Sequence, residues 1–244
     1  MLDTETLQRT GFATHRHETE VASTMGLAAA LCQRRRLDVL VTADRQTAGY
    51  GRAGREWHSA GGGLHLSLGL WQPALKPPNL YVVAAGLATL DVLDTLGAKV
   101  RLRWPNDVLA TWWDGERKIS GAIAEVHGGA LVLGVGINVK GRSSNWPGDL
   151  KNTGVTLEDL VIPAEPTEIL QAWLSAFRRL EKDRGGLVPA FRRRCGTLGR
   201  RVEVQLRDRR LTGLAKTLTE EGFLVVEEGG IGTVLEDCLL LREL

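Results

Sequence analysis

The chain has 244 residues, of which 43% are hydrophobic and 25% charged, and its formal net charge is +2 at pH 7. This balance is ordinary for a globular protein, and no apolar run reaches the roughly 18 residues that a membrane span needs. The first ten residues, MLDTETLQRT, have neither a basic start nor an apolar core, so they do not resemble a signal peptide.

Helices and strands are expected to alternate through residues 1–196. Residues 21–35 favour a helix, because alanine and leucine dominate and arginines lie at its end. Residues 64–71 (LHLSLGLW) alternate leucine with smaller or polar residues, which is the period of a half-buried strand. The other expected elements are strands at 37–43, 100–104, 107–113, 119–127 and 130–139, and helices at 79–97, 167–183 and 187–195.

From Thr197 onward the pattern changes to short strands at close spacing, at 201–206, 210–218, 223–228 and 238–244. They predict a small β-barrel of about 48 residues, which is small enough to need support from the larger domain. The whole chain is therefore predicted to be α+β. A mixed sheet flanked by helices forms the domain at 1–196, and a β appendage forms the domain at 197–244.

Basic residues outnumber acidic ones between Arg178 and Arg210. Helical spacing makes part of this segment the solvated face of a helix. Aromatic residues that could stack on bases do not interleave the charges, which disfavours a nucleic-acid surface. A non-enzymatic nucleic-acid-binding protein nevertheless stays open as a rival from another class.

The three cysteines are odd in number and far apart in the sequence. This spacing fits buried or free thiols in a reducing cytoplasm, and it does not fit a disulfide framework or a zinc site. We therefore expect the protein to be cytoplasmic.

Residues 46–57 (QTAGYGRAGREW) place three glycines and two arginines between two hydrophobic runs. Glycine allows positive φ angles and close backbone approach, and arginine offers forked donors for carboxylate and phosphate oxygens. Successive amides in such a turn also form a concave anion site. Taken alone, the stretch reads equally well as a mobile surface loop.

Four further segments accompany this loop in order: Ser23-Thr24, RWPNDVL (103–109), ERKISGAIAE (116–125) and GVGINV (134–139). Together they resemble the biotin protein ligases, also called biotin–[acetyl-CoA carboxylase] ligases. The pattern of that family has Ser-Thr-Asn, Gln-x-x-Gly-Arg-Gly-Arg-x-Gly-Arg-x-Trp, Lys-Trp-Pro-Asn-Asp, Lys-x-x-Gly-Ile-Leu and Gly-x-Gly-Ile-Asn elements. The resemblance extends over nearly the whole chain and implies a class II synthetase-like catalytic domain with a C-terminal SH3-like β-barrel.

The resemblance implies a two-step reaction that uses biotin, ATP and Mg²⁺. The carboxylate of biotin attacks the α-phosphate of ATP, which gives biotinyl-5′-adenylate and pyrophosphate. A lysine of a biotin carboxyl carrier protein, such as that of acetyl-CoA carboxylase, then attacks the mixed anhydride and releases AMP.

This chemistry needs positive charge where two anions meet, and the resemblance makes Lys118 and Arg52 the expected catalytic residues. Gln46, Ser23 and Thr24 are uncharged groups that suit the neutral ureido group of biotin. The expected biotin-binding residues are Ser23, Thr24, Gln46, Gly49, Gly51, Arg52, Lys118 and Gly121. The expected residues for ATP or the adenylate are Arg55, Trp57, Asn106, Lys118 and Asn138, and Asp107 is the candidate ligand of magnesium.

The chain departs from the family pattern at three positions. Met25 stands where the Ser-Thr-Asn element has asparagine, and Tyr50 stands where the loop has its first arginine. Arg103 replaces the lysine before Trp104, which keeps the charge. The first two changes put biotin affinity and adenylate retention in question.

The glycine-rich loop is expected to be mobile in the empty enzyme and to close as a lid over the ligand. Its three glycines make it costly to order, and Arg52 and Arg55 repel one another without an anion between them.

The nearest rival function is a lipoate or octanoate attachment enzyme of similar fold, whose ligand has no ureido group to need Gln46. Some biotin ligases also carry an N-terminal DNA-binding domain, which needs about 60 residues. The Ser-Thr element here begins at Ser23, so we expect a ligase that binds no specific DNA and no membrane. The expected oligomeric state is monomer or homodimer.

Overall fold

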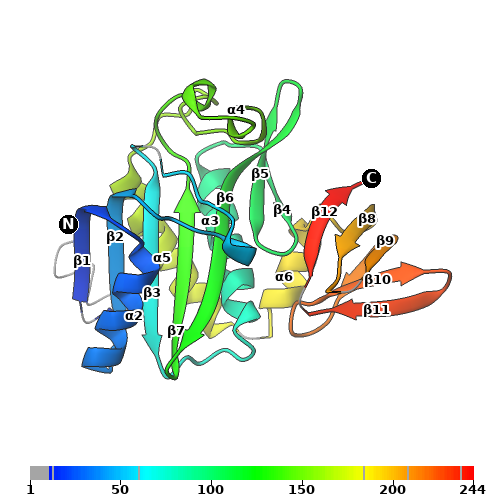
Figure 1. Cartoon of the computed structure of the whole chain (residues 1–244), viewed down its shortest axis with the longest axis horizontal. Coiled ribbons are helices and arrows are strands. Elements are labelled where there is room, and N and C mark those ends of the chain that lie inside the picture. Colours follow the sequence, from blue (N-terminus) through cyan, green and yellow to red (C-terminus); the bar gives the residue numbers. More distant parts are fainter. Residues whose placement is uncertain (1–10, 13, 60, 184, 208, 237) are drawn as a thin grey trace.

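The structure is a computed structural model that describes residues 11–244, apart from residues 13, 60, 184, 208 and 237. Two sheets lie side by side, and helices flank the larger one (Figure 1). The strands are β1 (Thr14–Val21), β2 (Val39–Gln46), β3 (Leu64–Trp71), β4 (Val100–Arg103), β5 (Asp107–Trp112), β6 (Gly115–His127), β7 (Ala130–Ile137), β8 (Arg201–Gln205), β9 (Arg210–Leu218), β10 (Leu224–Glu228), β11 (Ile231–Leu235) and β12 (Leu239–Glu243). The α-helices are α2 (Thr24–Arg35), α3 (Asn79–Thr95), α4 (Leu150–Thr153), α5 (Pro166–Lys182) and α6 (Leu187–Arg194), with short 3₁₀ turns at η1 (Arg52–Gly54) and η2 (Ser143–Asn145).

The larger sheet has seven strands in the order β1-β2-β3-β7-β6-β5-β4. β1 runs parallel to β2, and the other neighbouring pairs are antiparallel. The predicted α+β class with a mixed sheet is therefore confirmed. β7 occupies the middle of this sheet, between β3 and β6.

Side-chain alternation along the strands gives the sheet two different faces. The leucines of β3 point into the main core, beneath α3 and α5. Gly69 faces the other way, and a Cβ added to it would lie 2.7 Å from the Cβ of Cys32 in α2. The helix α2 therefore lies on one face of the sheet, and α3 and α5 lie on the other (Figure 1).

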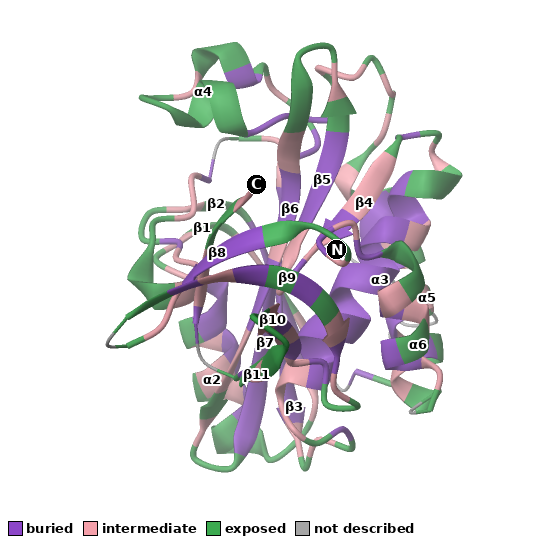
Figure 2. Ribbon diagram, turned by 90° about the vertical axis from the view of Figure 1, so that its right-hand side faces the viewer, coloured by how far each residue is buried: buried purple, intermediate pink, exposed green. Residues whose placement is uncertain are grey.

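The helix α3 is buried on nearly every side, between the sheet, α5 and α6 (Figure 2). Its sequence is apolar all round, as a helix in this central position requires. Trp173 and Phe177 of α5 stack on one another with ring centroids 4.9 Å apart, and Trp173 Nε1 donates a hydrogen bond to Thr89 of α3. These contacts fix the layer that supports the sheet from behind.

The sequence does not predict β1, whose residues THRHETEV are mostly polar. This strand lies at the edge of the sheet, where one side of the backbone and many side chains stay in solvent. His15 and His17 of this strand are both half-buried and contact the Thr42 hydroxyl, at 2.7 and 3.0 Å. Burial, with a smaller contribution from His17, lowers the pKa of His15 to about 4.

The end of β1 at Val21 also shifts the start of the first helix. α2 begins at Thr24 rather than at residue 21, and Ser23 is its extended N-cap residue, with φ −154° and ψ 134°. Ser23 and Thr24 therefore lie at the N-terminal end of the helix, where their polar groups can contact atoms outside the helix.

The C-terminal unit is an antiparallel sheet of five strands in the order β11-β10-β9-β8-β12. The expected small β unit is thus confirmed, with one strand, β11, that the apolar pattern does not predict because its residues are mostly exposed. Gly229 and Gly230 join β10 to β11 and both have positive φ, at 58° and 87°. This glycine pair between two strands is a known hairpin signal.

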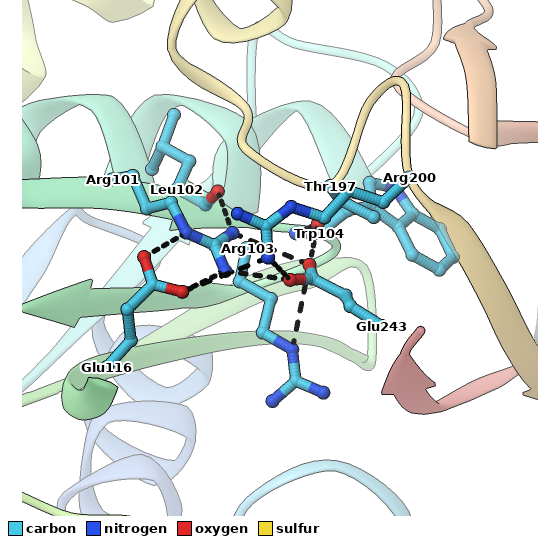
Figure 3. Close-up of polar contacts among 8 residues, drawn as sticks. All are labelled: Arg101, Leu102, Arg103, Trp104, Glu116, Thr197, Arg200 and Glu243. Carbon is cyan, nitrogen blue, oxygen red and sulfur yellow. Dashed lines mark hydrogen bonds and ion pairs between the residues drawn. The ribbon is translucent and has the colours of Figure 1, made fainter. Parts of the chain in front are cut away.

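A network centred on Glu243 joins the two sheets (Figure 3). The Glu243 carboxylate accepts hydrogen bonds from Arg101 Nη2 at 2.7 Å, Thr197 Oγ1 at 2.6 Å and Arg200 Nη1 at 3.0 Å. The Thr197 hydroxyl in turn accepts a hydrogen bond from the Trp104 amide at 3.0 Å. The last strand is therefore tied to β4 and to the turn that leads into β5.

The titration of this network follows from its contacts. Burial of Glu243 opposes its ionisation, but the hydrogen bonds from Arg101 and Thr197 outweigh burial and lower the pKa of Glu243 below 4.5. The hydrogen bonds from Arg101 likewise lower the pKa of Glu116, the second carboxylate on that guanidinium.

Within the described part of the chain, no helix combines the length and the apolar character needed to cross a membrane. Cys32 and Cys195 are buried free thiols, and Cys238 is also buried.

We expect Glu243→Gln to lower the free energy of unfolding by about 1–3 kcal/mol at pH 7, because Arg101 loses a charged partner at a site with little solvent. A carboxylate whose pKa is lower in the folded than in the unfolded protein stabilises the fold at pH values above its unfolded pKa. This stabilisation is lost as the pH falls through the folded pKa. The difference between variant and wild type should therefore shrink below about pH 4.5. Denaturant unfolding across this range measures it, with the exposed Glu220→Gln as control. A difference that stays constant into acid would contradict the account.

Candidate functional site

A cavity of about 230 Å³ opens on the α2 face of the large sheet. Its walls come from the start of α2, the end of β2, the glycine-rich loop, and strands β6 and β7. Ten of the residues predicted from the sequence line it: Ser23, Thr24, Gln46, Gly51, Arg52, Arg55, Trp57, Asn106, Lys118 and Gly121. The motifs that lie far apart in the sequence therefore converge on one site.

The floor of the cavity is a part of strand β7 whose cavity-facing residues are glycines. Gly134 and Gly136 are alternate residues of β7 and face the cavity. A Cβ added to Gly134 would lie 2.7 Å from Met25 Sδ, and one added to Gly136 would overlap the Trp57 ring. Only glycine at both positions therefore leaves room for Met25 and Trp57 to lie against the sheet.

Uncharged polar groups form one end of the cavity. The Gln46 side-chain oxygen accepts hydrogen bonds from the Thr24 amide at 2.8 Å and from Thr24 Oγ1 at 3.0 Å. Thr24 Oγ1 also lies 2.8 Å from Ser67 Oγ. The Gln46 amide is thereby fixed through its oxygen, so its NH₂ group is the part that can donate to a ligand.

A lysine and an aspartate form the charged centre. Lys118 Nζ lies 2.7 Å from Asp107 Oδ1, across the β5–β6 pair. A Cβ added to Gly121 would lie 3.0 Å from Lys118 Nζ and 3.4 Å from Asp107 Oδ1. Gly121 therefore leaves the space in which this ion pair sits, and Trp57 covers it with its ring centroid 5.4 Å from Lys118 Nζ.

A β-bulge aims Lys118 into the cavity. Val108 pairs with Ser120, whereas Leu109 pairs with Lys118, which leaves Ile119 as the extra residue. Without the bulge, Lys118 and Gly121 would point to opposite faces of the sheet, because they are three residues apart. The irregularity thus brings them together while the Ile119 side chain stays in the core.

Asn106 lines the cavity and Asn138 does not. Asn106 Nδ2 donates to the carbonyl of Ala122 at 2.9 Å, which fixes the turn before β5 against β6. Asn138 is buried, and its Nδ2 donates to the carbonyls of Lys118 at 3.3 Å and Val155 at 3.1 Å. Its predicted contact with the nucleotide stays a prediction, since the contacts described here support the Lys118 backbone.

The glycine-arginine loop is folded back on itself over the cavity. The Trp57 amide donates to the Gly49 carbonyl at 2.9 Å, and the Gly51 amide donates to the Arg55 carbonyl at 2.7 Å. Of the three glycines only Gly54 has a positive φ, at 69°. Gly49 serves close approach instead, because an added Cβ would lie 3.0 Å from Gln46 Nε2.

The two loop arginines have different surroundings. Arg52 Nη2 donates to the carbonyl of Cys238 at 2.9 Å, so this arginine reaches the C-terminal sheet. Arg55 is exposed at the rim of the cavity. Both line the same cavity as Lys118, and their role as a source of positive charge there stays a prediction.

The three departures from the family pattern have separate structural settings. Met25 packs on Gly134 in the cavity floor. Tyr50 donates a hydrogen bond from its hydroxyl to Glu125 Oε2 at 3.0 Å. Arg103 lies outside the cavity, with its Nε 3.9 Å from Glu243 Oε1, and so takes part in the contact between the two sheets.

Several lining residues are not predicted from the sequence as site residues. Gly134 and Gly136 lie inside a quoted motif, and glycine at alternate strand positions is a signal for a bare face that could have identified them. Leu66 and Leu150 carry no such signal, since leucine is an ordinary core residue. The remaining members are Met25, Tyr50, Glu56, Ala122, Ile123 and Val135.

Within the described residues, no group of three His, Cys, Asp or Glu side chains is arranged to hold a metal ion. Asp107 supplies a single carboxylate beside the cavity. Magnesium is commonly bound through one or two carboxylates together with substrate phosphates. Asp107 therefore fits a magnesium ion that arrives with a nucleotide, and it does not form a closed site of its own.

Known proteins resemble this chain in sequence and in fold. The model of the Biotin/lipoate A/B protein ligase family matches residues 30–141, and that of the Biotin protein ligase C terminal domain matches residues 197–235. The biotin--[acetyl-CoA-carboxylase] ligase of Mycobacterium tuberculosis is 33% identical over 207 residues, which cover 79% of this chain and 74% of that protein.

The bifunctional ligase/repressor BirA of Salmonella typhimurium is 29% identical over 208 residues, which cover 78% of this chain and 62% of that protein. The chain thus spans less than two thirds of the length of this bifunctional relative. Among solved structures, the biotin protein ligase from Aquifex aeolicus in complex with biotin and ATP superposes with a TM-score of 0.80 and 25% identity, over 95% of this chain and 100% of that chain.

We expect Gly136→Ala to destabilise the protein by about 1–3 kcal/mol, because the new methyl group overlaps the Trp57 ring. In a Trp57→Ala background the overlap is absent, so Gly136→Ala should lower the free energy of unfolding far less. A double-mutant cycle of unfolding free energies measures this coupling between the two residues. Gly26→Ala is the control, since its Cβ would meet nothing within 4 Å. Equal costs of Gly136→Ala in the two backgrounds would show that Trp57 is not seated on Gly136.

Proposed function

Because the chain belongs to the biotin protein ligase family, we propose that it activates biotin with ATP and transfers it to a lysine of a carrier protein. The observation that carries the proposal is one cavity that holds both an uncharged amide clamp and a cationic centre. Biotin has the matching parts: a neutral ureido group at one end and a carboxylate at the other. The proposed carrier is the biotin carboxyl carrier protein of acetyl-CoA carboxylase or a similar domain.

The ureido end is proposed to lie against Gln46. Thr24 fixes the Gln46 oxygen, so the NH₂ group is positioned to donate to the ureido carbonyl before biotin arrives. Ser23 lies at the same end of the cavity and offers a further hydroxyl. Preorganised neutral donors of this kind favour a ureido group over an apolar ring, because an unpaired donor is costly in a closed pocket.

The carboxylate of biotin is proposed to meet the α-phosphate of ATP at Lys118. One carboxylate oxygen forms a bond to the α-phosphorus, and the bond from that phosphorus to pyrophosphate breaks. Lys118 donates to the oxygens on which negative charge accumulates, and Arg52 and Arg55 reduce the repulsion between the two anions. Asp107 orients the Lys118 ammonium through their ion pair.

The nucleotide is proposed to lie beside Trp57, Asn106 and Asn138. Asp107 would hold magnesium together with the phosphates, and the ion would add positive charge there. In the second step the carrier lysine, as a free amine, attacks the acyl carbon, and AMP leaves with the bonding electrons. The loop at 49–57 shields the anhydride from water between the two steps.

We further propose that the chain divides into domains at 1–196 and 197–244. The start of the C-terminal family match at residue 197 and the change to an all-β pattern support this boundary. The free thiols of Cys32 and Cys195 agree with a reducing compartment, and we place the reaction in the cytoplasm.

Lys118→Met should lower the rate of biotinyl-adenylate synthesis by about 10²–10³-fold or more, because it removes a charge that acts on the reacting oxygens. Single-turnover formation of the adenylate from biotin and MgATP measures this step. The matched control is Lys140→Met, which removes an exposed lysine whose ammonium pairs with Glu165. A folded Lys118→Met protein with near-normal adenylate synthesis would remove Lys118 from the reaction.

A further inference from the structure

Tyr50 connects the loop at 49–57 to the large sheet. Its hydroxyl donates to Glu125 Oε2 on β6 at 3.0 Å, and the same oxygen lies 3.0 Å from His127 Nε2. The Tyr50 ring also packs against the apolar cluster beneath α2, which includes Met25 and Ile123. The side chain is thus held by its ring and by its hydroxyl.

The position of this contact sets its effect on the loop. The hydrogen bonds of Gly49 with Trp57 and of Gly51 with Arg55 join one part of the loop to another, so they do not tie it to the sheet. Tyr50 and Arg52 reach outward from it, to β6 and to the C-terminal sheet. Both also line the 230 Å³ cavity and a neighbouring cavity of about 670 Å³. Together with the Trp57 ring on Gly136 of β7, these two side chains hold the loop against the rest of the protein.

We propose that Tyr50 is a lid-positioning residue, whose hydrogen bond to Glu125 holds the loop closed over the cavity and so retains biotinyl-adenylate until the carrier lysine arrives. The retention part rests on the proposed function, whereas the closure part does not.

The residue type at this position decides how closure occurs. The related loop pattern has an arginine here, which an anionic ligand would attract. Tyrosine is neutral and has its partner, Glu125, within the protein, so this anchor does not depend on the charge of a ligand. Burial, aided by the hydrogen bond and the charge of Glu125, raises the pKa of Tyr50 to about 12, so the hydroxyl remains a donor at neutral pH. The sequence predicts a mobile loop in the empty protein, and this anchor restricts that movement.

The first test uses the protein without ligand. Trypsin needs an extended segment around the bond that it cuts, so faster cleavage after Arg52 and Arg55 reports that the loop leaves the sheet more often. Mass spectrometry identifies cuts at these two bonds. We expect cleavage there to be about tenfold faster in Tyr50→Phe than in the wild type, the effect of losing one partly exposed hydrogen bond to a charged group. Tyr81→Phe is the matched control, because it removes a buried hydroxyl that accepts from the Leu75 amide and lies away from the loop. Equal cleavage of Tyr50→Phe and wild type would overturn the proposal.

The second test measures retention. Protein loaded with labelled biotinyl-adenylate is chased with unlabelled adenylate, and Tyr50→Phe should release the label about tenfold faster than the wild type. Glu125→Ala should match Tyr50→Phe, and the double variant should be no worse than either, since both remove one bond. Glu125→Gln keeps an acceptor oxygen and should recover part of the retention. Additive losses in the double variant would show that the two residues act separately and would overturn the assignment.

The outcomes separate the two proposals. If the wild type forms no adenylate, the proposed function is wrong, and the trypsin comparison still decides whether Tyr50 holds the loop. If adenylate forms but Tyr50→Phe retains it as well as the wild type, the proposed function stands and the role of Tyr50 is wrong.

Discussion

The cavity depends on three strand positions that carry no side chain. Gly121 of β6 and Gly134 and Gly136 of β7 face the same side of the sheet, and the space above them holds Lys118, Met25 and Trp57. A side chain at any of these positions would meet one of those three groups. The helix α2 packs on this face over β2, β3 and β7, and the pocket lies beside the start of the helix. Packing on the opposite face, beneath α3 and α5, is what keeps the glycine-bearing strands in register.

Polar groups are then arranged around this space according to charge. Thr24 and Gln46 occupy one end as a neutral pair fixed by hydrogen bonds, and Lys118 with Asp107 occupies the other. Each of these groups has a partner within the protein, which holds it in a defined position. The C-terminal sheet contributes to the same arrangement. It accepts a hydrogen bond from Arg52 and, through Thr197 and Glu243, anchors the turn that carries Asn106 and Asp107.

The sequence predicts those parts of the site that short motifs encode. Lys118, Gln46 and Trp57 are recognisable from their neighbours in the chain, and the alternating leucines of β3 locate a strand without any motif. What it does not predict is contact between distant segments. The bulge at Ile119, which turns Lys118 toward Gly121, and the bond from Tyr50 to Glu125 depend on strand register and on a loop meeting a strand. The sequence does not predict strands β1 and β11 for another reason. They bury too little apolar surface for their residues to alternate between apolar and polar.

The central claim is that the clamp at Gln46 and the charge at Lys118 together select and activate biotin. Exchange of labelled pyrophosphate into ATP by the wild-type protein tests it most directly, since exchange requires reversible formation of an acyl-adenylate. The account predicts exchange that depends on biotin and is absent when biotin is replaced by lipoate or left out. Exchange supported by lipoate, or no exchange with biotin in a folded protein, would contradict it.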